Sequence, residues 1–129
     1  MGSGVLAATV SSDDPRTTRA YAHCAAADES TEDIVVLLLN VGSEPVDVAL
    51  VAGTIIPDME VPRTEWHFTA SAGLRGTGIR LGEVELQWEP GRPLPSMPGA
   101  REASAGPVHM APQSIAFVRL DGVALSGVC

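Results

Sequence analysis

The alternation of hydrophobic and polar positions along the chain predicts strands and almost no helix. In residues 16–24, "RTTRAYAHC", one face carries Thr18, Ala20, Ala22 and Cys24, and the other carries Arg19, Tyr21 and His23. A period of two is typical of a strand whose two faces meet different surroundings. Residues 34–41, "IVVLLLNV", are apolar at successive positions and predict a central strand that is covered on both faces.

Turn signals divide the middle of the chain into further short strands. "GSEP" (42–45) leads into "VDVALVAG" (46–53), which we expect to complete a hairpin with the strand before it. "IIPDMEVPRTEW" (55–66) carries two prolines and predicts a linker or an edge, and "EWHFTA" (65–70) predicts a short strand. "IRLGEVELQW" (79–88) alternates about Gly82, which indicates a tight turn or a bulge between two short strands.

The last third of the chain combines a proline-rich crossing with a central strand. "EPGRPLPSMPGAREASAGP" (89–107) contains five of the ten prolines and predicts a long irregular connection. "MAPQSIAFVRL" (110–120) is apolar on both faces, with Pro112 at its entrance, where a missing N–H costs least. "DG" then turns the chain into a last predicted short strand, "VALSGVC" (123–129).

Together these segments predict an all-β, antiparallel β-sandwich of about seven or eight short strands. The length of 129 residues suits one domain with a single core. We assign residues 1–15 to a lead-in and residues 16–129 to the sandwich.

Charge and hydropathy exclude some classes of partner. Eight arginines, no lysine and sixteen acidic residues give a net charge of -8, which argues against nucleic acid as a partner. Arg16 and Arg19 form the nearest approach to a basic cluster, and we interpret them as solvated surface. The sequence contains no run of about 18 apolar residues, so it predicts no transmembrane segment. The first ten residues lack the pattern of a secretory signal.

Residue spacing predicts no catalytic, metal-binding or cofactor-binding site. The histidines His23, His67 and His109 do not stand at zinc-ligand spacings, so we interpret them as surface or half-buried residues. A cysteine at the very end of a chain is also a poor nucleophile, because nothing holds it in place. We interpret the acidic residues that could act as glycosidase carboxylates as exposed charges: Glu60, Glu65, Glu83, Glu85, Glu89 and Glu102.

Two pairs of residues leave alternatives open. Trp66 and Trp88 are compatible with a sugar-stacking platform, or with anchors in a core or an interface. Cys24 and Cys129 are compatible with two unpaired buried thiols, or with a disulfide that closes most of the chain into one loop. Such a disulfide would stabilise the fold by roughly 4–5 kcal/mol in the chain-entropy model.

Four segments in this order resemble the C-terminal region of heparanase-like proteins, the endo-β-glucuronidase family of retaining glycoside hydrolases. The segments are "MGSGVLAATV", then "RAYAHC", then "IVVLLLNV" with "EWHFTA", and finally "LPSMPG" through "VHMAPQSIAFVRL" to the last cysteine. The similarity is greatest to the plant-type branch. The most specific parts are "RTTRAYAHC" before an aliphatic strand that ends in Asn, and "APQSIAFVRL" shortly before a terminal Cys.

This resemblance implies an accessory β-sandwich that packs on a (β/α)₈ barrel of the same polypeptide. The barrel carries both catalytic glutamates, so this chain would be inactive alone and would meet a uronic-acid polysaccharide only through the barrel. The resemblance also implies a disulfide between Cys24 and Cys129. Such a disulfide would place the protein in an oxidising compartment, which means the secretory pathway, the extracellular space, or a lysosome or vacuole.

The chain departs from the family pattern at three places. The connection between residues 46–53 and 63–70 is shorter than usual, and Leu81-Gly82-Glu83 stands where the family has Leu-Asn-Gly. "MGSGVL" resembles an internal segment of the family, so we expect Met1 to be an internal residue of a longer protein. Without the barrel, we expect the sandwich to have an unfilled sheet edge and an apolar patch on the side that would face the barrel. The alternative functions are a free-standing carbohydrate-binding or adhesion sandwich, favoured if both tryptophans share an exposed face, and a complete small hydrolase.

Overall fold

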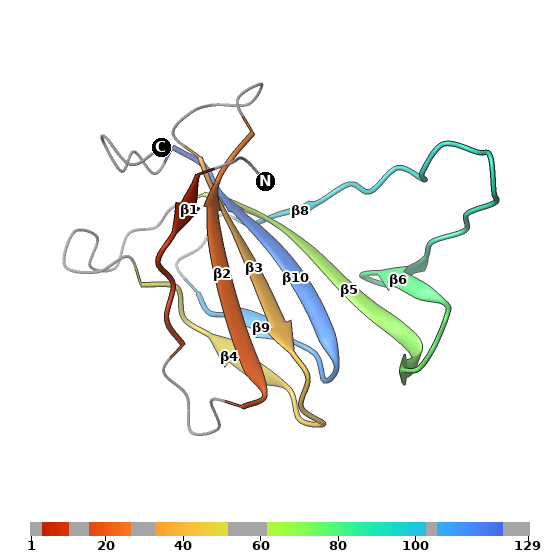
Figure 1. Ribbon diagram of the computed structural model, residues 1–129, viewed down its shortest axis with the longest axis horizontal. Coiled ribbons are helices and arrows are strands. Elements are labelled where there is room, and N and C mark those ends of the chain that lie inside the picture. Colours follow the sequence, from red (N-terminus) through yellow and green to blue (C-terminus); the bar gives the residue numbers. More distant parts are fainter. Residues whose placement is uncertain (1–3, 11–15, 27–32, 52–61, 103–105, 123–129) are drawn as a thin grey trace.

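The computed structural model describes residues 4–10, 16–26, 33–51, 62–102 and 106–122 (Figure 1). These residues form ten strands and no helix, and all the strand pairs are antiparallel. The predicted all-β, sandwich-like class is therefore confirmed, with more strands than expected.

The strands form two sheets of very unequal size. The larger sheet has the order β1-β2-β3-β10-β5-β6-β7, and β8 also pairs with β5, while β4 and β9 make the small sheet. The larger sheet contains β1 (Val5–Leu6), β2 (Thr18–Cys24), β3 (Ile34–Asn40), β5 (Arg63–Leu74), β6 (Ile79–Leu81), β7 (Val84–Glu85), β8 (Ala100–Glu102) and β10 (Ser114–Leu120). The small sheet contains β4 (Val46–Val48) and β9 (Val108–Met110).

Strand β10 is central, as its doubly apolar sequence predicts. It pairs over its whole length with β3 on one side and with β5 on the other, so that Phe117 stands between Leu37 and Trp66. Pro112 lies in the turn just before the strand, where its missing N–H removes no ladder hydrogen bond.

The predicted hairpin between residues 34–41 and 46–53 is wrong. Strand β4 pairs with β9 in the small sheet, and Asp47 lies opposite His109. Both edges of β3 are already occupied by β2 and β10, so β4 has no free edge of β3 to join. The buried Asn40 fixes the departure of the chain, because its amide donates to the carbonyl oxygens of Glu44 and Ala111 and its Oδ1 accepts from the backbone N–H of Gly42.

The main core lies between the small sheet and one face of the larger sheet. Figure 1 shows β4 and β9 behind β2, β3 and β10, and the buried side chains of both layers meet there. Leu38, Val108, Ala116 and Val118 are fully buried, with 0% of their surface exposed. Burial alternates along all of β3 and along residues 114–118 of β10, so this covered face is made by every second residue.

Strand β5 is longer than the segment 65–70 that predicted it, and its far half carries the β6–β7 hairpin. Gly82, with φ of +57°, makes the turn between β6 and β7, in agreement with the sequence. Residues 86–99 then leave the sheet without forming a strand and return at β8 (Figure 1).

Other predicted segments fall partly or wholly beyond these residues. Within the predicted lead-in, Val5–Leu6 forms β1 and pairs with His23 and Ala22 at the edge of the larger sheet. The last predicted strand, 123–129, lies outside the described residues, as does most of the linker at 55–66.

Candidate functional site

The strand register gives the larger sheet a second apolar face, opposite the main core. Leu37 alternates with the buried residues of β3 and therefore points away from the small sheet. It lies opposite Tyr21 of β2 and Phe117 of β10, and Phe117 lies opposite Trp66 of β5. One row of apolar side chains thus crosses four neighbouring strands.

A second row runs beside the first. Leu39 of β3 lies opposite Ile115 of β10, which lies opposite Phe68 of β5, and Phe68 lies opposite Leu81 of β6. The rows pack together, since the rings of Phe68 and Phe117 meet edge to face with centroids 6.0 Å apart. We call the two rows with their neighbour Ile79 the outer face, which comprises Tyr21, Leu37, Leu39, Trp66, Phe68, Ile79, Leu81, Ile115 and Phe117.

The outer face is partly open to solvent. Tyr21 is 49% exposed, Ile115 42% and Ile79 50%, and the other members are half-buried. Among the strands in the described part of the chain, none lies over this face, because the β4–β9 layer covers the opposite one. A contiguous apolar surface on a sheet is typical of a face that docks against another protein surface.

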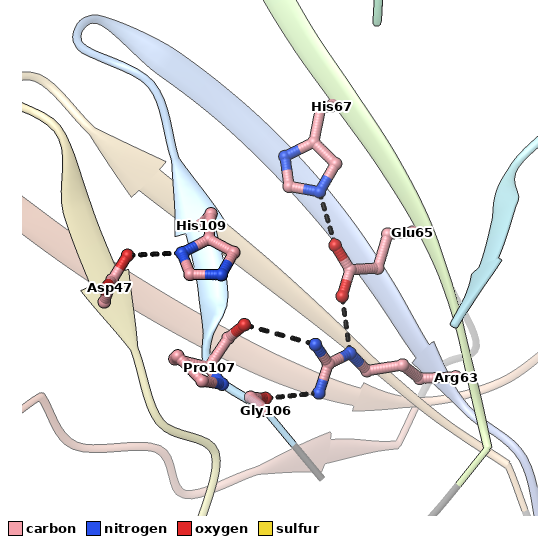
Figure 2. Close-up of polar contacts among 7 residues, drawn as sticks. All are labelled: Asp47, Arg63, Glu65, His67, Gly106, Pro107 and His109. Carbon is pink, nitrogen blue, oxygen red and sulfur yellow. Dashed lines mark hydrogen bonds and ion pairs between the residues drawn. The ribbon is translucent and has the colours of Figure 1, made fainter. Parts of the chain in front are cut away.

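A charged cluster interrupts the apolar surroundings on the covered side of β5. Arg63, Glu65 and His67 stand at every second position, in register with the buried residues of β10. Glu65 accepts hydrogen bonds 2.5 Å long from Arg63 Nε and from His67 Nε2 (Figure 2). Arg63 also donates to the carbonyl oxygens of Gly106 and Pro107, at 2.5 and 3.2 Å.

The interpretation of Glu65 as an exposed charge is wrong. Glu65 is only 7% exposed and Arg63 8%, because they face the layer that contains β9. Alternation along β5 did not reveal this, since the buried face of that strand carries charges where a hydrophobic pattern would show apolar residues. Arg63 ties β5 to the segment that enters β9, so the arrangement supports a brace between the layers.

The remaining acidic candidates are dispersed. Glu83, Glu85 and Glu89 are exposed as predicted, whereas Glu60 and the side chain of Glu102 lie outside the described residues. The solvent exposure of Glu83, Glu85 and Glu89 agrees with the surface role predicted for them.

The three histidines are surface or half-buried residues, as predicted. His109 of β9 forms a cross-strand pair with Asp47 of β4, with 2.6 Å between Nδ1 and Oδ1, and both side chains are exposed (Figure 2). His23 is half-buried on β2, and His67 is held by Glu65. Among the described residues, no three His, Cys, Asp or Glu side chains are grouped as a metal ion would require.

The two tryptophans stand on different elements. Trp66 belongs to the outer face, and its indole N–H donates to the carbonyl oxygen of Met97 at 2.8 Å. Gly99 packs so closely on the ring that an added Cβ would lie 2.6 Å from Trp66 Cε2, so only glycine fits there. Trp88 follows β7, is 54% exposed, and donates to the carbonyl oxygen of Arg92 at 3.2 Å.

Cys24 is the last residue of β2 and is 8% exposed beside the core. In the strand register it lies opposite Ile34 of β3. It is disulfide-bonded. Its sulfur lies so close to Gly4 that a Cβ there would be 2.6 Å from Sγ. The predicted partner, Cys129, lies outside the described residues, and the pairing with Cys129 stays a prediction.

Comparison with known proteins gives no family. No protein-family profile matches the chain, and neither does any curated protein. In the described residues, the structure has no helix with the length and apolar character needed to cross a membrane.

Proposed function

We propose that this chain is the accessory, stabilising β-sandwich of a heparanase-like glycoside hydrolase, and that it is catalytically incomplete on its own. In this proposal the outer face packs on the (β/α)₈ barrel of the same polypeptide. The barrel supplies both catalytic glutamates and binds the uronic-acid polysaccharide. The resemblance of the four sequence segments supports the choice of partner.

The outer face is the observation that carries the proposal. When one face of an antiparallel sheet is exposed to solvent, the side chains on that face are polar. Apolar and polar residues then alternate along each strand. Here β3 and β10 carry apolar side chains on both faces. On a solvated face, the large side chains of Leu37, Phe117 and Trp66 would stay in contact with water. A second layer of protein over these residues removes that apolar surface from water.

The charged residues of the structure are compatible with a structural role. Arg63 and Glu65 are buried, and His67 beside them is half-buried. The Glu65 carboxylate accepts from both neighbours, and Arg63 also bonds to the segment that enters β9, so the cluster braces the two layers of the sandwich. The disulfide at Cys24 fits the secretory, extracellular, lysosomal or vacuolar location that the resemblance implies.

Complementation tests the proposal. A plant-type heparanase-like (β/α)₈ barrel, expressed without its own sandwich, is co-expressed with this chain, and hydrolysis of a chromogenic β-glucuronide is measured. We expect the chain alone to be inactive, and we expect its presence to restore soluble, active barrel. Ile115→Glu places a charge on the outer face and should abolish the rescue.

The matched control is Val51→Glu, which changes an exposed valine that follows the β4 region and is not part of the outer face. It should rescue as well as the natural chain does. Rescue by Ile115→Glu equal to that of the control would contradict the proposed interface, and turnover by the purified chain alone would contradict the proposed function.

A further inference from the structure

The apolar surface of the outer face continues onto the segment that follows β6. We call residues 82–99, which run from the β6–β7 turn to the start of β8, the arm. The second row of the outer face ends at Leu81, and Val84 of β7 lies opposite Leu81. Val84 is 68% exposed. The row therefore extends across a fifth strand, and the boundary between the outer face and the arm is apolar.

The arm carries a large share of the exposed apolar side chains. In the described part of the chain, ten large hydrophobic side chains are exposed. Four of these belong to the arm, which are Val84, Trp88, Leu94 and Met97. Three more belong to the outer face, which are Tyr21, Ile79 and Ile115. Exposed apolar surface is thus concentrated on the outer face and on the segment next to it, which is typical of a docking surface.

Both ends of the arm are fixed to β5. At its start, β7 pairs with β6 and β6 pairs with β5, and the N–H of Leu86 prolongs this hairpin by donating to the carbonyl oxygen of Ile79 at 2.8 Å. At its end, the indole N–H of Trp66 donates to the carbonyl oxygen of Met97 at 2.8 Å. Gly99 then packs on the Trp66 ring with no room for a side chain. One residue of the outer face therefore positions the end of the arm.

The middle of the arm is closed by its own hydrogen bonds. The N–H of Arg92 donates to the carbonyl oxygen of Glu89 at 3.0 Å, and the indole N–H of Trp88 donates to that of Arg92 at 3.2 Å. Gly91, with φ of +81°, allows this turn. Figure 1 shows the segment after β7 standing away from the sheet. A surface that is already fixed in shape loses less conformational entropy when a partner covers it.

The outer face alone is small for a lasting interface. It comprises nine residues, whereas a stable protein–protein interface uses about 20–30 residues on each side. A partner that covers it must therefore reach beyond it. Past Phe117, the next residue of β10 on this face is Arg119, which forms ion pairs with Asp33 and Asp121. The apolar surface continues toward Val84 and the arm, and not toward this charged end of β10.

From these features we infer that the arm is a second contact with the (β/α)₈ barrel, made together with the outer face. The inference rests on the proposed function, because it takes the barrel as the partner that covers the outer face. The barrel covers Val84 as a continuation of the second row, and it presents further apolar surface to Trp88 and Leu94. A barrel without apolar surface at that place would be bound by the outer face alone, and more weakly.

The affinity of arm variants for the barrel tests the inference. The plant-type barrel of the complementation experiment is co-expressed with the chain and carries an affinity tag, and retention of the chain over a dilution series gives a Kd. Leu94→Glu and Val84→Glu should each raise the Kd about tenfold or more, because each places a charge against apolar surface. The matched control Val51→Glu, at a site 76% exposed and outside both surfaces, should leave the Kd unchanged. All three variants should keep the urea midpoint of the natural chain, since the replaced side chains are exposed.

Hydroxyl-radical footprinting of the natural complex is the second measurement. Trp88 reports on the arm and Tyr21 on the outer face, and oxidation of both should fall when the barrel binds. Protection of Tyr21 without protection of Trp88 would overturn the arm contact and leave the proposed function standing. A Kd for Leu94→Glu equal to that of Val51→Glu would do the same. If the natural chain does not copurify with the barrel, the proposed function and this inference are both overturned.

Discussion

Replacing Glu65 by alanine removes the acceptor that neutralises a buried arginine. In the folded chain the carboxylate receives Arg63 Nε at 2.5 Å and His67 Nε2 at 2.5 Å. After the substitution Arg63 keeps its bonds to Gly106 and Pro107, but the buried carboxylate that accepts from its Nε is gone. Breaking a buried pair in this way typically costs about 3–5 kcal/mol.

The loss is large relative to the stability of a domain of this size, which is about 5–15 kcal/mol. With a urea m-value of about 2 kcal/mol/M, a loss of about 4 kcal/mol lowers the urea midpoint by about 2 M. Glu65→Gln keeps an acceptor for Arg63 and should lie between the natural chain and Glu65→Ala. The measurement is urea unfolding followed by circular dichroism at neutral pH.

Two further variants decide whether burial is the cause. Glu83→Ala removes a carboxylate whose side chain is 98% exposed and 3.7 Å from Arg80, and it should change stability by about 0.5 kcal/mol or less. The double variant Arg63→Met/Glu65→Leu replaces both charges by apolar side chains and should recover most of the loss. A midpoint for Glu65→Ala that equals the midpoint for Glu83→Ala would refute the brace.

Three other changes follow from the same structure. Leu38→Ala empties a fully buried position between the layers and should cost about 2–5 kcal/mol in urea unfolding, whereas a loss below about 1 kcal/mol would show that Leu38 is not in the core. Asn40→Ala removes two donated bonds and one accepted bond at the start of the β3–β4 loop and should cost about 2–3 kcal/mol; an unchanged thermal midpoint would contradict the role given to Asn40. Cys24→Ser removes the disulfide and should lower stability by about 2–5 kcal/mol, and reductant should lower the melting temperature of the natural chain but not of the variant.

The strands with strong hydrophobic patterns could be predicted from the sequence. Segment 114–120 is apolar on both faces, and it lies at the centre of the larger sheet. The turn at Gly82 was also predictable, since a glycine between two alternating segments indicates a position with positive φ. These features depend on local residue order, which the sequence displays directly.

Other features depend on contacts between distant residues. Strand β4 lies in the small sheet because β2 and β10 occupy both edges of β3. The sequence of residues 42–53 does not show that these edges are occupied. The burial of Glu65 depends on Gly106 and Pro107, which are more than forty positions away along the chain. The hydrogen bond from the Trp66 indole to the carbonyl oxygen of Met97 likewise depends on the placement of the 86–99 loop in space.

The most direct test of the proposed partner is to read the transcript upstream of the codon for Met1. The account predicts an open reading frame that continues upstream and encodes a (β/α)₈ barrel with two catalytic glutamates. That result would identify the surface that covers Leu37, Phe117 and their neighbours. An in-frame stop codon directly upstream, with no barrel encoded in the same frame, would contradict the claim that this sandwich is part of a heparanase-like hydrolase.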